Sequence, residues 1–271
     1  MATRNWLFPI LPGFLAGYAG PAVAAGLDLS GNGGGPIEVV ADDGIEWEQD
    51  SNRFIARGNA RASRGNVITS ADILTAYYRE TSGGGTVIHR FEAFGDVQTK
   101  SETATAYGDA RYYDVVRSLL VLTGRNLRLE TATDKIFARD SLEYWGGTVN
   151  AAVARGAARA VSQGKTLEAE ILTAFFPDKD GKNEISEVKA EVGVTVRTAT
   201  EVIKANSGIY DVRKGIVDLV GNVRITRGAN QLNGDRGQVN LNTGKSRLFS
   251  TTKGGSGARV KGMLVPKKTT E

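Results

Sequence analysis

Very few side chains in this sequence have the types and spacing that catalysis or metal binding requires. His89 is the only histidine among the 271 residues, and there is no cysteine. Thiolate zinc sites, cysteine nucleophiles and disulfides are therefore excluded, and a lone histidine offers neither a metal-binding pair nor a recognisable Ser-His-Asp arrangement. The 30 Asp and Glu residues leave a catalytic carboxylate pair open. The sequence favours a protein that is not an enzyme and that uses no metal and no cofactor.

Glycine is the other residue type whose clustering could indicate chemistry. The "GGG" at 83–85 and the "GGSG" at 254–257 are not followed by helical patterns, so neither has the context of a phosphate-binding loop. Single glycines also recur inside apolar segments, 28 to 37 residues apart. They are Gly58, Gly95, Gly124, Gly156, Gly193 and Gly221. An exported β-helix lyase is the enzyme alternative, but its rungs would have a shorter and more regular period.

The elements that would position functional residues read as β-strands. Apolar and polar residues alternate in "VRSLLVLTG" (116–124), "GIVDLVGNVRITRG" (215–228) and "RGQVNLNTGKSRLF" (236–249). Pro177 is the only proline between positions 37 and 265, which suits hydrogen-bonded strands. Because long windows with helical apolar spacing are missing, we predict an all-β body of about 16–20 strands.

The charges indicate a mixed surface. The chain has 34 basic and 30 acidic residues, a net charge of +4, and the two signs are interspersed. A basic stripe is not present, so we expect no nucleic-acid partner. A second interpretation, that individual basic residues lie along the path of an anionic ligand, stays open.

The body of the chain repeats itself. "SADILTAYY" (70–78) returns as "EAEILTAFF" (168–176), an offset of 98 residues. The interior glycines pair at the same offset or one less: Gly58 with Gly156, Gly95 with Gly193 and Gly124 with Gly221. A glycine within a strand marks a bulge or a bend, so we expect each pair to bend a long strand at an equivalent point. We predict two tandem units, 37–138 and 139–265.

The N-terminus has the features of an export signal. Arg4 is the only charged residue before Asp28, and "AVAA" at 22–25 supplies the small residues of a cleavage site. We assign 1–25 to a signal peptide, 26–36 to a flexible glycine-rich linker and 266–271 to a tail, which predicts a periplasmic protein. The uncharged stretch is long enough for the alternative, a retained membrane anchor, although prolines and glycines interrupt it.

Several phrases resemble the OstA-like, or LptA, family. They are "GTVIHRFEAFGDVQT", "VVRSLLVLTGRNLRL", "IVDLVGNVRITRGANQLNGDRGQVNLNTGKSRLF" and the closing "GARVKGMLVPKK". The resemblance implies an open antiparallel β-jellyroll whose two sheets form a V-shaped trough. Here two tandem units would be stacked into one continuous trough.

The same resemblance implies a function and partners. It implies that lipid A acyl chains of lipopolysaccharide lie in the trough and that the protein carries or bridges this lipid across the periplasm. The implied partners are LptC-like and LptD-like jellyroll proteins, joined by edge-strand pairing, and further copies of the chain in a head-to-tail homo-oligomer. An LptC-like protein anchored in the inner membrane and a structural β-scaffold without lipid are the alternatives.

Alternation predicts which face turns inward. In residues 67–77 and 167–175, every second side chain is uncharged, whereas Asp72 and Glu170 lie on the opposite faces. The predicted lipid-contacting residues are Val67, Ala71, Ile73, Tyr77, Leu119, Val121, Leu167, Ala169, Ile171 and Phe175. The alternative is that these residues only fill a closed core.

We expect the mature chain to begin near Ala25, because the small residues before it match a cleavage site. N-terminal sequencing of the native protein checks this. An intact Met1 in the membrane fraction would instead support the anchored alternative.

Overall fold

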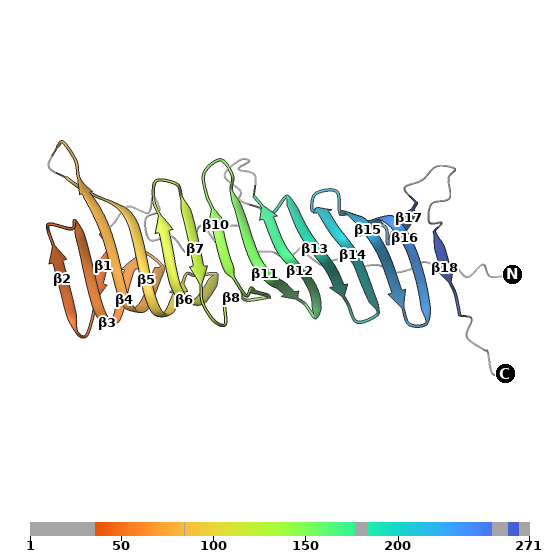
Figure 1. Cartoon of the computed structure of the whole chain (residues 1–271), viewed down its shortest axis with the longest axis horizontal. Helices are drawn as coiled ribbons and strands as arrows, with labels where there is room; N and C mark the ends of the chain where they lie inside the picture. The colour runs from red at the N-terminus through yellow and green to blue at the C-terminus, as the bar shows by residue number, and fades with distance from the viewer. Residues whose placement is uncertain (1–35, 84, 177–183, 251–259, 266–271) are drawn as a thin grey trace.

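The computed structural model describes residues 36–83, 85–176, 184–250 and 260–265. Within these residues the regular secondary structure consists of β-strands alone, and the strands join into one 18-stranded antiparallel sheet (Figure 1). The predicted all-β antiparallel class is confirmed. The described part of the chain holds no helix of the length and apolarity that a membrane crossing needs. The predicted signal peptide, the linker as far as residue 35 and the tail lie outside the described residues.

The strands run from the start of the described body to its end. They are β1 Glu38–Val40, β2 Gly44–Glu48, β3 Arg53–Arg64, β4 Val67–Glu80, β5 Thr86–Lys100, β6 Ala104–Asp114, β7 Leu119–Thr123, β8 Arg128–Thr131, β9 Asp134–Phe137, β10 Ser141–Trp145, β11 Ala151–Ser162, β12 Lys165–Phe175, β13 Glu187–Arg197, β14 Glu201–Asp211, β15 Ile216–Arg227, β16 Asn230–Asn240, β17 Lys245–Phe249 and β18 Lys261–Met263.

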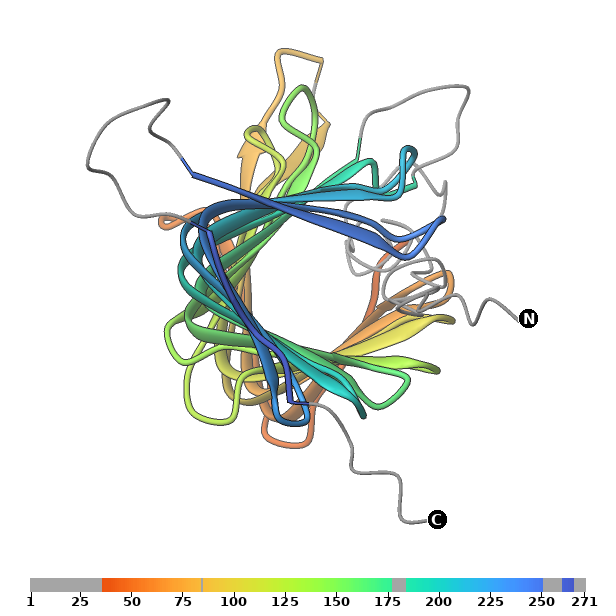
Figure 2. The ribbon, with the colours of Figure 1, turned by 90° about the vertical axis from the view of Figure 1, so that its right-hand side faces the viewer.

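Two walls arise because long strands change partners halfway along. The first half of β3 pairs with β2 and its second half with β1. In the same way β6 divides between β8 and β7, β11 between β10 and β9, and β16 between β18 and β17. The strand halves aligned with β1, β8, β9 and β18 form what we term the β1 wall, and those aligned with β2, β7, β10 and β17 form the β2 wall. Viewed along the stack, the walls meet at a bend and diverge from it, as in an open jellyroll (Figure 2).

The bend is made by β-bulges at glycines in the middle of strands. The pairing register of β3, β5, β11, β13 and β15 shifts at these glycines, whose φ angles lie between +76° and +80°. They are Gly58, Gly95, Gly156, Gly193 and Gly221. Only glycine adopts this backbone conformation readily, so the prediction that these glycines mark bends is confirmed. Gly124 differs, because it follows the end of β7.

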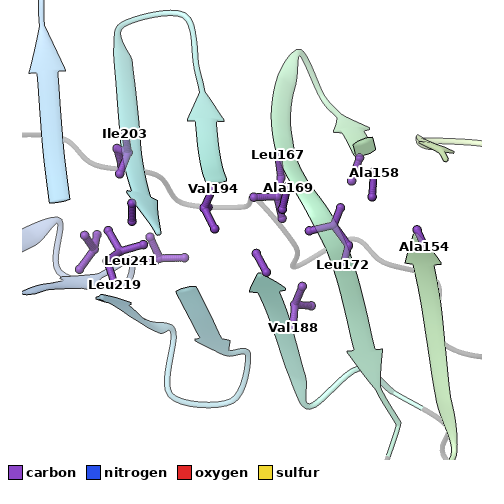
Figure 3. Packing of buried hydrophobic residues seen from close by; sticks show 14 of the residues in the cluster. Ala154, Ala158, Leu167, Ala169, Leu172, Val188, Val194, Ile203, Leu219 and Leu241 are labelled. Atoms are coloured by element: carbon purple, nitrogen blue, oxygen red, sulfur yellow. The ribbon is translucent and has the colours of Figure 1, made fainter. Parts of the chain in front are cut away.

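Apolar side chains on the inner faces of the walls form the core. In the second half of the chain one cluster extends from β11 to β16 and includes Leu172, Val194, Ile203 and Leu219 (Figure 3). The first half has smaller clusters, one of which contains Phe91, Tyr113 and Leu120. The long strands therefore bury side chains on both sides of the bend.

Replacing Gly95 with alanine should destabilise the fold more than the same change at Gly193. Both glycines lie in bulges at nearly the same φ, and the left-handed conformation costs an L-residue about 1–2 kcal/mol. A Cβ at Gly95 would also overlap the Asp72 side chain of β4, whereas no described atom lies within 4 Å of a Cβ at Gly193. Urea denaturation should therefore show a further loss of about 1–3 kcal/mol in unfolding free energy for Gly95→Ala. Equal losses would contradict this account of the bend.

Candidate functional site

An apolar cavity lies between the walls in the second half of the chain. Its volume is about 60 Å³, and its lining comes from β12 to β16 and the residue that follows β16. The lining includes Leu167, Val196, Ile203, Gly208, Leu219 and Val239. Among the described side chains, none of those that line it is charged. This interior is suited to hydrocarbon. Tyr210 is the ionisable residue among the described ones that line it, and burial raises the pKa of its phenol.

A wider cavity of about 280 Å³ lies between the walls in the first half. Its lining is mostly apolar, with Phe54, Leu74 and Phe91 among the contributors. The polar and charged residues of the lining are Thr69, Thr75, Glu92 and Arg111. The two halves therefore share an architecture and differ in the chemistry of their interiors.

The β4 residues that were predicted to share one inward face lie on two different faces of the strand. Ala71 is buried in the core and Val67 precedes it on the same alternation, but the register shifts between Ser70 and Ile73. After this bulge Leu74 faces inward. The predicted inward placement of Ile73 is wrong, because its cross-strand partner is Phe94, which is 65% exposed.

Tyr77 is the second residue that the bulge turns outward. Its hydroxyl donates to Glu92 at 3.1 Å, and the Arg90 guanidinium lies 3.7 Å from the centre of its ring. The neighbouring Ala76 packs on the core, and Tyr78 is buried. The inward placement of Tyr77 is therefore also wrong.

The same reversal occurs in the second copy. Leu167 and Ala169 belong to the buried cluster, as predicted for their face. The register of β12 then shifts between Glu168 and Ile171, after which Leu172 lies in the cluster. Ile171 pairs with Glu191 on the outer face, so its predicted placement is wrong.

Phe175 follows Ile171 on the outer face of β12. It pairs with Glu187, whereas the adjacent Phe176 is buried in the cluster. The prediction of an inward Phe175 is therefore wrong.

The β7 residues Leu119 and Val121 were also placed on the wrong face. Their cross-strand partners on β10 are Trp145 and Glu143, and the Trp145 indole donates to Glu143 on the outside. The inward residues are the alternate ones, Leu120 and Leu122. All four β7 positions 119–122 are apolar, so alternation could not distinguish the two faces.

Charged groups gather on the outside of the bend. Arg139 donates to Asp140 at 2.8 and 2.9 Å and to Glu170 at 2.9 Å. The hydrogen bonds from Arg139 lower the pKa of Asp140. The bulge N–H of Ala157 also donates to Glu170, at 3.3 Å, and Asp72 is exposed. The two acidic side chains expected on the outer face, Asp72 and Glu170, therefore lie there, and Glu170 accepts a hydrogen bond from a bulge N–H.

His89 lies apart from the trough. It lines a surface pocket with Arg79, Asp114, Val116 and Arg117. Within the described residues there is no group of three or more His, Cys, Asp or Glu that could hold a metal ion.

Both ends of the sheet expose backbone edges together with apolar side chains. At one end Trp47 is 60% exposed, and at the other Leu264 is 69% exposed. In the part of the chain that the structure describes, β2 pairs only with β3, and β18 only with β16. Such edges can accept a strand from another chain.

Comparison with known proteins supplies the family. The sequence profile described as "LptA/(LptD N-terminal domain) LPS transport protein" matches residues 38–144 and 149–245. No curated protein matches the chain. A solved structure, LptH, described as "the LptA homologous periplasmic component of the conserved lipopolysaccharide transport device from Pseudomonas aeruginosa", is matched at 10% identity over 85% of this chain and 96% of that chain, with a TM-score of 0.22. Because the profile covers most of its length, the chain belongs to the LptA/LptD N-terminal-domain family of lipopolysaccharide transport proteins.

Proposed function

We propose that this protein binds the acyl chains of lipopolysaccharide between its two walls and carries the lipid across the periplasm towards the outer membrane. The observation that carries the proposal is the apolar interior of the walls in both halves of the chain. Each methylene group exposed to water costs roughly 0.8 kcal/mol, so exposing a lipid with several long chains would cost ~tens of kcal/mol unless the protein shields the chains from water. A trough supplies that cover without any covalent step.

We further propose that the chain consists of two tandem units forming one trough. The family profile matches twice, and the bulges of the two halves recur at the same spacing, Gly58 with Gly156 and Gly95 with Gly193. The sheet passes from one half to the other through the pairing of β7 with β10, so both interiors lie along one stack. A trough of double length would cover a longer part of the route.

The exposed edges support assembly by strand addition. An LptC-like or LptD-like jellyroll, or a second copy of this chain, could pair with β1 and β2 at one end or with β17 and β18 at the other. Exposed Ile45 and Trp47 at the first end and Met263 and Leu264 at the second would be covered by such contacts. A β-scaffold without lipid and an anchored LptC-like protein are the competing functions.

Lipid contact is tested by photo-crosslinking at adjacent positions that face opposite sides. We expect a photoreactive side chain to form lipopolysaccharide adducts at Leu74 and at Tyr210, which line the two cavities. The matched controls are Ile73 and Ile209, each one residue away on the outer face. Mass spectrometry would measure the amount of lipid adduct at each of the four positions. Equal labelling within each pair, or none, would leave a packed β-scaffold.

Assembly is tested by trimming the C-terminal edge. Removing residues 258–271 deletes β18 and should shorten or abolish head-to-tail oligomers in light scattering, because the edge strand that would pair is lost. The control deletes only 266–271, which leaves β18 in place. Unchanged assembly after the longer deletion would count against edge pairing at this end.

A further inference from the structure

A surface pocket of about 370 Å³ lies against the β2 wall of the first half, at the strand ends far from the bend. Its described lining consists of Arg79 near the end of β4, His89 on β5, Asp114 at the end of β6, and Val116 and Arg117 in the turn that follows. Two guanidiniums and an imidazole thus share the pocket with one carboxylate. The pocket therefore has a net positive charge and suits an anionic ligand.

The pocket opens on the outer face of the wall. Tyr78 precedes Arg79, Tyr113 precedes Asp114, and both tyrosines are buried. Because successive side chains of a strand point to opposite faces, Arg79 and Asp114 point outward.

A second bulge in β5 places His89 in this pocket. Tyr77 of β4 pairs with Arg90, and the next residue, Tyr78, pairs with Ile88, so the pairing of the two strands passes over His89. The extra residue of a bulge commonly re-aims a side chain. Here it brings the imidazole to the side of the wall where the two arginines lie.

Asp114 fixes the turn that carries Arg117. The Arg117 backbone N–H donates to Asp114 Oδ1 at 2.9 Å, whereas Arg117 Nε lies 3.9 Å from Asp114 Oδ2. The Arg117 side chain is 76% exposed. The carboxylate therefore holds the backbone of the turn and leaves guanidinium N–H groups accessible, and paired N–H groups of this kind fit the oxygens of a phosphate.

The corresponding turn of the second half contains a closed ion pair instead. The Lys214 backbone N–H donates to Asp211 at 3.0 Å, as Arg117 does to Asp114. The Lys214 ammonium, however, lies 2.7 Å from the second oxygen of Asp211. The same backbone thus presents a lysine bound to its own carboxylate in one half and an accessible arginine in the other.

The other two positions differ as well. Ser186 corresponds to His89, because the carbonyl of each accepts the N–H of the residue that directly follows β14 or β6. The register of β12 with β13 does not shift between Ile171 and Phe175, so the second bulge of β5 has no counterpart there. In the sequence, Pro177 stands at the place of Arg79. The strands of the fold therefore pair without an arginine and a histidine at these places.

The position of the pocket suits the polar part of a lipid whose chains lie between the walls. Tyr78 and Ile88, next to Arg79 and His89, belong to the inner side of the same strands. A sugar phosphate would lose its hydration in an apolar interior at a high cost, so it must lie at the open side, near the ends of the strands. The pocket has more than ten times the volume of about 30 Å³ that a water molecule occupies in the liquid, so a phosphate group fits.

We propose that Arg79, His89 and Arg117 form an anion-binding site on the outer rim of the β2 wall, and that this site takes a phosphate group from the sugar part of the transported lipid. The proposal rests on the proposed function, because the cargo brings the phosphate to the rim. The competing explanation is that the three side chains form an ordinary solvated surface.

The test compares equilibrium binding of phosphorylated and dephosphorylated lipid A to the full mature chain. The combined variant Arg79→Gln, Arg117→Gln should weaken binding of the phosphorylated lipid about three- to tenfold and leave binding of the dephosphorylated lipid unchanged. Both side chains are exposed, so the variant should keep the fold. Equal weakening of both lipids, or no weakening of either, would overturn the site.

A matched control removes the same charge from the corresponding turn of the second half. Arg213→Gln combined with Lys214→Gln deletes two exposed positive charges and should leave the preference for the phosphorylated lipid unchanged. If this control weakens the phosphorylated lipid as much as the first variant does, the effect is a general attraction between a basic protein and an anion, and the site is overturned.

Inorganic phosphate separates this site from the proposed function. His89 is the only histidine of the chain, so its ring NMR signals in the untagged protein report on the pocket alone. If the wild-type protein binds neither lipid, the proposed function fails, and the phosphate titration decides the site. A saturable shift of the His89 signals that is lost in the Arg79→Gln, Arg117→Gln variant would then support it, and the absence of a shift would overturn it. Where the lipids do bind selectively, such a shift shows that free phosphate is also recognised, and its absence shows that the phosphate must be attached to the lipid.

Discussion

The architecture depends on one backbone constraint, the bulge that each long strand carries at its bend. Two walls built from the same strands require the chain to turn without losing its hydrogen-bonded neighbours, and an inserted residue with positive φ allows this. Three of the glycines at the bend lie against a neighbouring acidic side chain: a Cβ at Gly58, Gly95 or Gly156 would overlap Asp43, Asp72 or Asp140. The glycine bulges therefore mark where these strands bend and the line along which the walls meet, and at three of them the glycine lies directly against an acidic side chain.

The bulge also decides which side chains reach the interior. One extra residue reverses the alternation, so Ala71 and Leu74 face inward on either side of Asp72, and Ala169 and Leu172 on either side of Glu170. The strand content, the bends and the repeat could be predicted from the sequence, because alternation, interior glycines and spacing are local signals. Which side chains face inward after the bend could not be predicted, because the two-residue alternation does not continue through the register shifts of β4 and β12. The sequence did contain a signal for this reversal in β4. Its two neighbouring strands carry interior glycines, Gly58 on β3 and Gly95 on β5, and the register shifts at both.

The proposed carriage of lipopolysaccharide would require no catalytic group. The driving force is the removal of hydrocarbon from water, which is non-directional and acts along the whole trough. An apolar surface of this kind offers hydrocarbon many positions of similar energy, which agrees with the proposed movement of lipid along the trough. Charges of the bend, such as Arg139 with Asp140 and Glu170, are kept on the outer surface, where hydration is retained.

The two halves of the chain differ in the side chains that line their interiors. The two halves of this chain keep the same register around Arg111 and Gly208, so the backbone does not dictate the side chain there. A guanidinium in one half and a glycine in the other make the interiors of the two halves different. The two halves thus share a backbone arrangement, and the change at three interior positions, from Thr69, Thr99 and Arg111 to Leu167, Val196 and Gly208, gives their interiors different chemistry.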